Sequence, residues 1–254
     1  YETKQRVLFL TLNRPEKRNA LNPELVKELR DAFGKAETDE NIRVVVLQSE
    51  GPAFCAGLDL DELGKISKMT ALEKLADSEN LAGLFRQIYT HKKLIISKVQ
   101  GAAIAGGCGL AVLADIVVAD REKASFCFTE VKIGFVPAIV GALILRRTRN
   151  AGVREMLLRG NRVTADEALR LGLVTHAVAS TDLESTVAAI AEDICTNTSP
   201  SSVELTKQLL LGAETMALED SINFAISLNA QARSSDDLKK GIRAFLNKEK
   251  ISWK

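Results

Sequence analysis

The sequence is poor in the residues that build metal clusters and disulfide frameworks. It holds four cysteines and two histidines among 254 residues, and Cys55, Cys108, Cys127 and Cys195 fit no paired metal-ligand spacing. Buried, reduced thiols are therefore favoured, which predicts a reducing, cytoplasmic location and no metal site. There is also no run of about 18 apolar residues, so we expect no membrane span.

The chain also lacks an excess of charge of either sign. Its 34 basic and 33 acidic residues give a net charge of +1, so no strong field favours nucleic acid or a membrane surface as a partner. With 46% hydrophobic and 26% charged residues, the composition is globular. The length allows one large domain or two.

Apolar patterns predict that strands and helices alternate over the first half of the chain. Strands are expected at 7–12, 43–49, 94–99, 116–119 and 124–128. Asn22-Pro23 provides a helix N-cap and a first-turn proline, and 61–89 is a polar helical stretch whose early part is a candidate mobile segment. After Pro137 the chain is predicted to be mainly helical. We therefore expect an α/β protein with a helical C-terminal third.

A glycine-rich stretch follows the predicted strand at 94–99. Residues 101–115 read GAAIAGGCGLAVLAD, and Gly106 and Gly107 stand where a buried helix is expected to begin. Glycine lets a ligand approach backbone N–H groups without a Cβ in the way, and the first amides of a helix have no internal partner. The stretch fits a site for an anion or for a carbonyl oxygen that becomes one, although taken alone an ordinary turn is the commoner explanation.

Two nucleotide-binding patterns do not match this stretch. A dinucleotide fingerprint would need Gly or Ala where Val112 stands, and a Walker phosphate loop would need a Gly-Lys-Ser/Thr sequence that does not follow. Elsewhere, Glu130 stands out because the segments before and after it are apolar. An unpaired acid in such surroundings has a raised pKa and is a candidate proton carrier, whereas pairing with Lys132 or a backbone group would make it structural.

Five segments, in this order, resemble the enoyl-CoA hydratase/isomerase (crotonase) superfamily over nearly the whole chain. They are Asn13-Arg14-Pro15 with Asn19-Ala20-Leu21-Asn22, Phe54 to Leu60, Ala105 to Gly109, Thr129-Glu130-Val131 with Gly134 and Pro137, and Ala165 with Ala168 and Gly172-Leu173-Val174. Each segment is weak alone, but five in register are specific and favour a site over a turn.

The resemblance implies a crotonase-like ββα superhelix, a spiral of repeated ββα units with two sheets. Residues 1–190 would form this core and residues 191–254 a helical region that builds a homotrimer, or a hexamer from two trimers. An acyl-CoA thioester would be the substrate, with no separate cofactor.

Individual site roles also follow from the resemblance. Leu58 and Gly106 match the two peptide N–H donors of the oxyanion hole, and Glu130 matches the catalytic acid. Ala56 matches a position that holds CoA near its adenine, and Lys248 a basic residue that meets the CoA 3′-phosphate, across a subunit boundary in one arrangement. Further phosphate contacts are expected from Lys17 and Arg18, and pocket positions from Gly107, Gly109, Asp59 and Pro137. Asp59 could instead cap a helix.

Gly109 stands where the best-known hydratases of this family have a second glutamate. Glycine cannot hold a water, but it would leave room for a bulkier acyl group. The chain is similar to single-glutamate members such as the methylglutaconyl-CoA hydratase type, so we expect hydration of a branched or dicarboxylic enoyl-CoA. The alternatives are a Δ3,Δ2-enoyl-CoA isomerase with Glu130 as its only base, and a non-catalytic paralogue that binds acyl-CoA or RNA.

Overall fold

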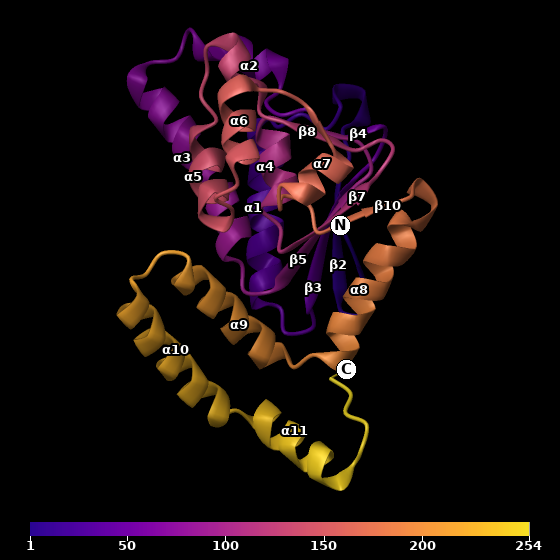
Figure 1. The fold of residues 1–254 in the computed structure, drawn as a ribbon. Coiled ribbons are helices and arrows are strands. Elements are labelled where there is room, and N and C mark those ends of the chain that lie inside the picture. The colour runs from indigo at the N-terminus through magenta and orange to yellow at the C-terminus, as the bar shows by residue number, and fades with distance from the viewer. Residues whose placement is uncertain (254) are drawn as a thin grey trace.

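Between residues 44 and 127, successive strands alternate between two sheets in the computed structural model, which describes residues 1–253 (Figure 1). One strand of each pair joins a large sheet, and the next joins a small one. The pairs are β3 (Val44–Ser49) with β4 (Ala53–Cys55), β5 (Leu94–Val99) with β6 (Ala102–Ile104), and β7 (Ile116–Asp120) with β8 (Ser125–Cys127). This alternation produces a spiral of ββα units, and the expected α/β fold class is confirmed.

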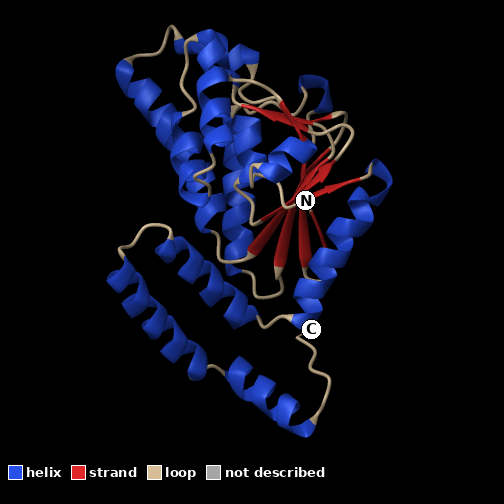
Figure 2. Cartoon of the chain, viewed as in Figure 1, coloured by secondary structure: helices blue, strands red, loops and turns tan. Residues whose placement is uncertain are grey.

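The large sheet has six strands and the small sheet four (Figure 2). The large sheet has the order β1-β2-β3-β5-β7-β10 and is parallel except for β1, which pairs antiparallel with β2. The small sheet has the order β4-β6-β8-β9, with β9 antiparallel to β8. The additional strands are β1 (Glu2–Lys4), β2 (Val7–Leu12), β9 (Val163–Thr164) and β10 (His176–Val178).

Both faces of the large sheet are buried, as the valine run in β3 predicts. Val45 and Leu47 join the main core, which lies between this sheet, the small sheet and the helices of the first half of the chain. Val44 and Val46 point to the opposite face and pack with residues of α8 (Leu183–Asn197), including Val187 and Ala191.

The helices begin where polar caps stand in the sequence. Asn22 accepts a hydrogen bond from the Leu25 amide, and capping boxes open the helices that begin at Ala71 and Ala165. The helical stretch expected at 61–89 is two helices. The helices not yet given are η1 (Pro15–Lys17), α1 (Pro23–Thr38), α2 (Leu60–Ile66), α3 (Ala71–Thr90), α4 (Gly106–Val112), η2 (Thr129–Ile133), α5 (Ala138–Arg147), α6 (Ala151–Arg159), α7 (Ala165–Arg170), η3 (Ser180–Asp182), α9 (Pro200–Ala213), α10 (Leu218–Arg233) and α11 (Asp236–Asn247).

The last three helices form an arm that extends away from the two sheets (Figure 1). The arm is anchored by Lys207 of α9, whose ammonium donates to Asp115 at 2.5 Å and to the Lys93 carbonyl at 2.9 Å. The boundary expected after residue 190 falls inside α8, a continuous helix that packs on the large sheet. The arm therefore starts at α9. No helix among residues 1–253 combines the length and the apolar character needed to cross a membrane.

Candidate active site

The two segments expected to donate amides lie side by side. A methyl group placed on Gly57 would lie 2.9 Å from the Ile104 carbonyl oxygen and 3.7 Å from the Gly106 nitrogen. Gly57 has φ +89°, a conformation that glycine adopts without strain. The close approach brings the end of the segment after β4 against the start of α4.

The amide of Leu58 is left free by the way its neighbours are paired. Leu21 donates to the Gly57 carbonyl at 2.7 Å, and Asp59 donates to the Leu21 carbonyl at 2.8 Å. In this parallel pairing the amide of the residue between them points away from the partner strand. Within residues 1–253, the Leu58 amide therefore has no acceptor.

The amide of Gly106 is also free, because this residue is the first of α4. No acceptor for it occurs among the described residues. Ala105 precedes it with φ +49° and ψ −124°, a conformation that is costly for a residue with a side chain. The Ala105 amide is fixed by the Cys127 carbonyl at 2.8 Å. The strained residue sets the direction in which the chain enters α4.

The neighbouring glycines serve different purposes. A Cβ on Gly107 would lie 2.3 Å from the Cys55 carbonyl oxygen, so Gly107 is required for the packing of α4 against β4. A Cβ on Gly106 would meet only the ends of Leu21 and Phe85, at 3.4 and 3.7 Å. Gly107 is thus a packing residue rather than the pocket residue that we expected. Packing alone does not require glycine at Gly106.

Glu130 lies in the short helix η2 and carries a buried carboxylate oxygen, Oε2, that has no hydrogen-bond partner in the part of the chain that the structure describes. Burial raises the pKa of the Glu130 carboxyl. Burial raises the pKa of the Cys108 thiol on α4, and the charges of Cys127 and Glu130 add to this shift, which indicates that the Glu130 carboxylate faces the side of the molecule that holds α4. The alternative of pairing with Lys132 does not occur, because neither an ion pair nor a hydrogen bond joins the two side chains.

The space beside Gly109 is filled. A Cβ at this position would lie 2.5 Å from Val140 Cγ2 and 3.2 Å from Phe85 Cε1. The expectation that Gly109 leaves room for a larger acyl group is therefore wrong, because α5 supplies the valine that occupies that room. Pro137, which precedes α5, is buried and fixes the start of this helix.

A narrow cavity of about 30 Å³ opens beside the Leu58 segment, between α1, α2 and α3. Leu58 itself lines it, together with Leu21, whose side chain a Cβ on Gly106 would contact at 3.4 Å. Most of the remaining wall is apolar, from Pro23, Val26, Ile66, Met69 and Leu81, and the polar wall residues are Asn22, Glu62, Asp77 and Asn80. Such a lining suits the hydrocarbon part of a small ligand.

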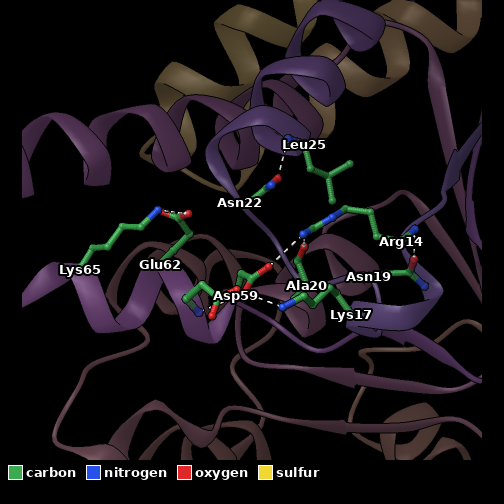
Figure 3. Close-up of polar contacts among 10 residues, drawn as sticks. Arg14, Lys17, Asn19, Ala20, Asn22, Leu25, Asp59, Glu62 and Lys65 are labelled. Carbon is green, nitrogen blue, oxygen red and sulfur yellow. Dashed lines mark hydrogen bonds and ion pairs between the residues drawn. The ribbon is translucent and has the colours of Figure 1, made fainter.

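Asp59 is a structural residue and does not line this cavity. One carboxylate oxygen accepts from the Asp61 amide at 3.1 Å, which caps α2, and the other pairs with Arg14 at 3.0 Å (Figure 3). The first of these bonds is the largest cause that lowers the pKa of Asp59. The pocket role expected for Asp59 is thus replaced by the capping alternative. Arg14 belongs to the first segment of the family resemblance, but its role could not be predicted from the sequence.

Three of the residues expected to contact CoA lie together. The Ala56 amide donates to the Arg18 carbonyl at 3.0 Å, and the neighbouring Lys17 pairs with Asp61 at 3.0 Å. Lys248 ends α11 in the arm, at the opposite end of the molecule from α2 (Figure 1). Within one chain, Lys248 therefore does not lie near Ala56, Lys17 and Arg18.

Comparison with known proteins identifies relatives over the full length. The family model described as enoyl-CoA hydratase/isomerase matches residues 2–254. A Thermus thermophilus protein named as a candidate enoyl-CoA hydratase is 42% identical over 245 residues, covering 96% of each chain. The (E)-benzylidenesuccinyl-CoA hydratase of Thauera aromatica is 34% identical, covering 96% of this chain and 94% of its own. A crystal structure of an enoyl-CoA hydratase from Mycobacterium smegmatis has a TM-score of 0.92 at 30% identity, covering 100% of this chain and 97% of that one.

These matches agree with the alternating sheets, the adjacent amide segments and the half-buried acid at Glu130. They span both the sheets and the C-terminal arm. The chain belongs to the enoyl-CoA hydratase/isomerase (crotonase) family.

Proposed function

We propose that this protein is an enoyl-CoA hydratase, which adds water to, or removes it from, an α,β-unsaturated acyl-CoA thioester. In this proposal the thioester oxygen lies between the amides of Leu58 and Gly106, and Glu130 moves the proton. The observation that carries the proposal is the Glu130 oxygen that is buried without a partner among the described residues, on the side of the molecule that holds the helix beginning with Gly106.

The reaction needs these groups because negative charge develops on the thioester oxygen when water adds at the β carbon. Each preorganised amide donor typically contributes about 3–4 kcal/mol of transition-state stabilisation. Free donors at Leu58 and Gly106 satisfy this requirement. Glu130 then takes a proton from the attacking water and returns one to the α carbon, a contribution of about 10²–10⁴-fold. A carboxylate with a raised pKa suits both steps.

A Δ3,Δ2-enoyl-CoA isomerase is the second candidate, and one observation favours it. Val140 fills the place beside Gly109 that a second acid would need, so a single carboxylate is available there. One glutamate suffices to carry a proton between the α and γ carbons. In either reaction the substrate itself supplies the CoA, and the proposed chemistry uses no separate cofactor.

The proposed acyl group is short and branched, as in methylglutaconyl-CoA-like substrates. The support is the narrow cavity beside Leu58, whose wall includes Val26, Ile66 and Met69. Apolar side chains of this kind favour methyl-bearing chains over polar ones. Whether the cavity accepts the second carboxylate of a dicarboxylic acyl group depends instead on the polar wall residues.

The proposed assembly is a homotrimer or a hexamer of two trimers. Large apolar side chains are exposed along α10 and α11, among them Leu218, Ile226, Phe245 and Leu246. Exposed apolar surface of this extent indicates a protein interface. Such an interface would also allow Lys248 of one subunit to approach the CoA held near Ala56, Lys17 and Arg18 of another. We further propose a cytoplasmic location, which suits four buried cysteines of which Cys55, Cys108 and Cys127 are free thiols.

The test compares turnover of crotonyl-CoA, 3-methylglutaconyl-CoA and 3-hexenoyl-CoA by the wild type and by Glu130→Gln. We expect faster hydration of crotonyl-CoA than of 3-methylglutaconyl-CoA, whose acyl group ends in a carboxylate, and a loss of about 10²–10⁴-fold in kcat with unchanged CoA affinity in the variant. Glu192→Gln on the exposed face of α8 is the matched control and should retain full activity. Turnover of the 3-enoyl substrate alone would establish the isomerase. Full activity of Glu130→Gln would remove Glu130 as the base.

A further inference from the structure

We infer that Glu62 and Asp77 make the acyl cavity a charge filter that disfavours acyl groups with a distal carboxylate. The inference rests on the proposed function, because it takes the cavity beside Leu58 as the place of the acyl chain. A methylglutaconyl-CoA-like substrate combines a branched carbon chain with a second carboxylate, and the cavity treats these two features differently. The apolar wall of this cavity favours a branched carbon chain, whereas its two acids disfavour a second carboxylate.

The two acids come from different helices but line the same cavity. Glu62 lies on α2 one turn before Ile66, so both side chains face the cavity from one side. On α3, Asp77 and Leu81 are spaced in the same way and face it from the other. Each helix thus presents one apolar side chain and one carboxylate to the bound chain.

Among residues 1–253, no basic side chain lines this cavity. Two cations form hydrogen bonds with residues of the cavity wall, but their own side chains do not line the cavity. Lys65 pairs with Glu62 at 2.7 Å (Figure 3), and its own side chain is largely exposed. Arg30 donates to Asn80 Oδ1 at 2.6 Å and lies against Gly83, within the groove between α1 and α3.

The charge of Glu62 is partly offset by Lys65, so Asp77 is the stronger element of the filter. Among the described residues, no cation pairs with the Asp77 carboxylate. A carboxylate on the substrate would enter a narrow space next to this charge and would leave water without gaining a cationic partner. Like charges brought together in this way reduce affinity and increase discrimination between ligands.

The experiment measures the dissociation constants of butyryl-CoA and succinyl-CoA by calorimetry. Both carry four-carbon acyl groups, but only succinyl-CoA ends in a carboxylate, and neither has a double bond to be hydrated. We expect the wild type to bind butyryl-CoA at least about tenfold more tightly at low salt, with a smaller ratio at high salt. The Asp77→Asn/Glu62→Gln double variant should reduce the ratio to about twofold, mainly by tighter binding of succinyl-CoA.

Glu79→Gln is the matched control, because Glu79 is an exposed acid on the same helix and does not line the cavity. It should keep the wild-type ratio. Equal binding of the two ligands by the wild type, or an equal change in Glu79→Gln and Asp77→Asn, would overturn the inference. Since binding is measured without turnover, an inactive protein that still prefers butyryl-CoA would reject the proposed function and leave the filter standing.

Discussion

The Arg14 guanidinium lies 3.0 Å from the Asp59 carboxylate and donates to the Ala20 carbonyl at 2.6 Å. The pair joins the loop after β2 to the residue that follows Leu58. Asp59 is 4% exposed, so its charge depends on this partner and on the Asp61 amide. The motif around Arg14 therefore acts at a distance along the chain, by fixing the segment that presents the Leu58 amide.

Replacing Arg14 should weaken both stability and activity. Arg14→Met leaves a buried carboxylate without its cation, so we expect a loss of about 2 kcal/mol in the free energy of unfolding. The kcat should fall more than the affinity for CoA, because the donor at Leu58 shifts. Urea denaturation and steady-state kinetics measure the two effects. Lys27→Met is the control, since it breaks an exposed pair with Asp31 and should cost less than about 1 kcal/mol. Equal losses in the two variants would contradict this account.

Gly106 and Gly107 should respond in opposite ways to the same substitution. Gly107→Ala forces a methyl group onto the Cys55 backbone, so we expect a loss of about 3 kcal/mol or failure to fold. Gly106→Ala meets only side-chain ends at ordinary contact distances, and should keep a melting temperature near that of the wild type. Its methyl group would lie beside Leu21 in the acyl cavity, and we expect kcat/KM to fall at least about tenfold. Melting curves and kinetics of the two variants provide the test. A stable and fully active Gly106→Ala protein would show that no ligand approaches this amide.

The elements that the sequence predicted best are those in which local pattern and tertiary packing agree. The strands expected at 7–12 and 94–99 occur with the same bounds, because their apolar runs are buried in the large sheet. The short strands β4 and β6 were not predicted, since each directly follows glycine or proline residues that favour a turn.

The site residues likewise divide into those that the local sequence reveals and those that only tertiary packing reveals. Glu130 was predicted because an acid among apolar residues is conspicuous in a sequence. The occupation of the space at Gly109 could not be predicted, because Val140 lies 31 positions away and reaches it only through the packing of α5 on α4. Glu62 and Asp77 were likewise hidden, because each looks like an ordinary surface acid until α2 and α3 meet over the cavity.

Activity and stability should depend on pH in opposite directions through Glu130. Burial raises its pKa in the folded protein above the ordinary value of 4.5, so the folded state holds the proton at higher pH than the unfolded state. Stability contributed by the protonated acid is therefore lost as pH rises through this raised pKa, whereas kcat/KM increases as the base ionises.

Glu130→Gln tests both directions, because it removes the ionisation. The variant should melt about 2 °C higher than the wild type at pH 7.5, and the difference should vanish at pH 4. The wild-type kcat/KM should show an acid limb with an apparent pKa above 4.5. A variant that melts at the same temperature as the wild type at both pH values would show that burial does not perturb this carboxyl.

Restoring the second family glutamate should fail unless Val140 is also reduced in size. In Gly109→Glu alone, the new Cβ would lie 2.5 Å from Val140 Cγ2, so we expect a loss of about 3 kcal/mol or more in the free energy of unfolding. In Gly109→Glu/Val140→Gly, the contact is removed and the carboxylate gains space beside α5. The double variant should fold better than the single one and hydrate crotonyl-CoA faster, because two acids can position the water. Thermal melting and hydration rates of both variants, with Val140→Gly as the control, measure the coupling between the positions. Additive effects of the two substitutions would show that Val140 is not what excludes the second acid.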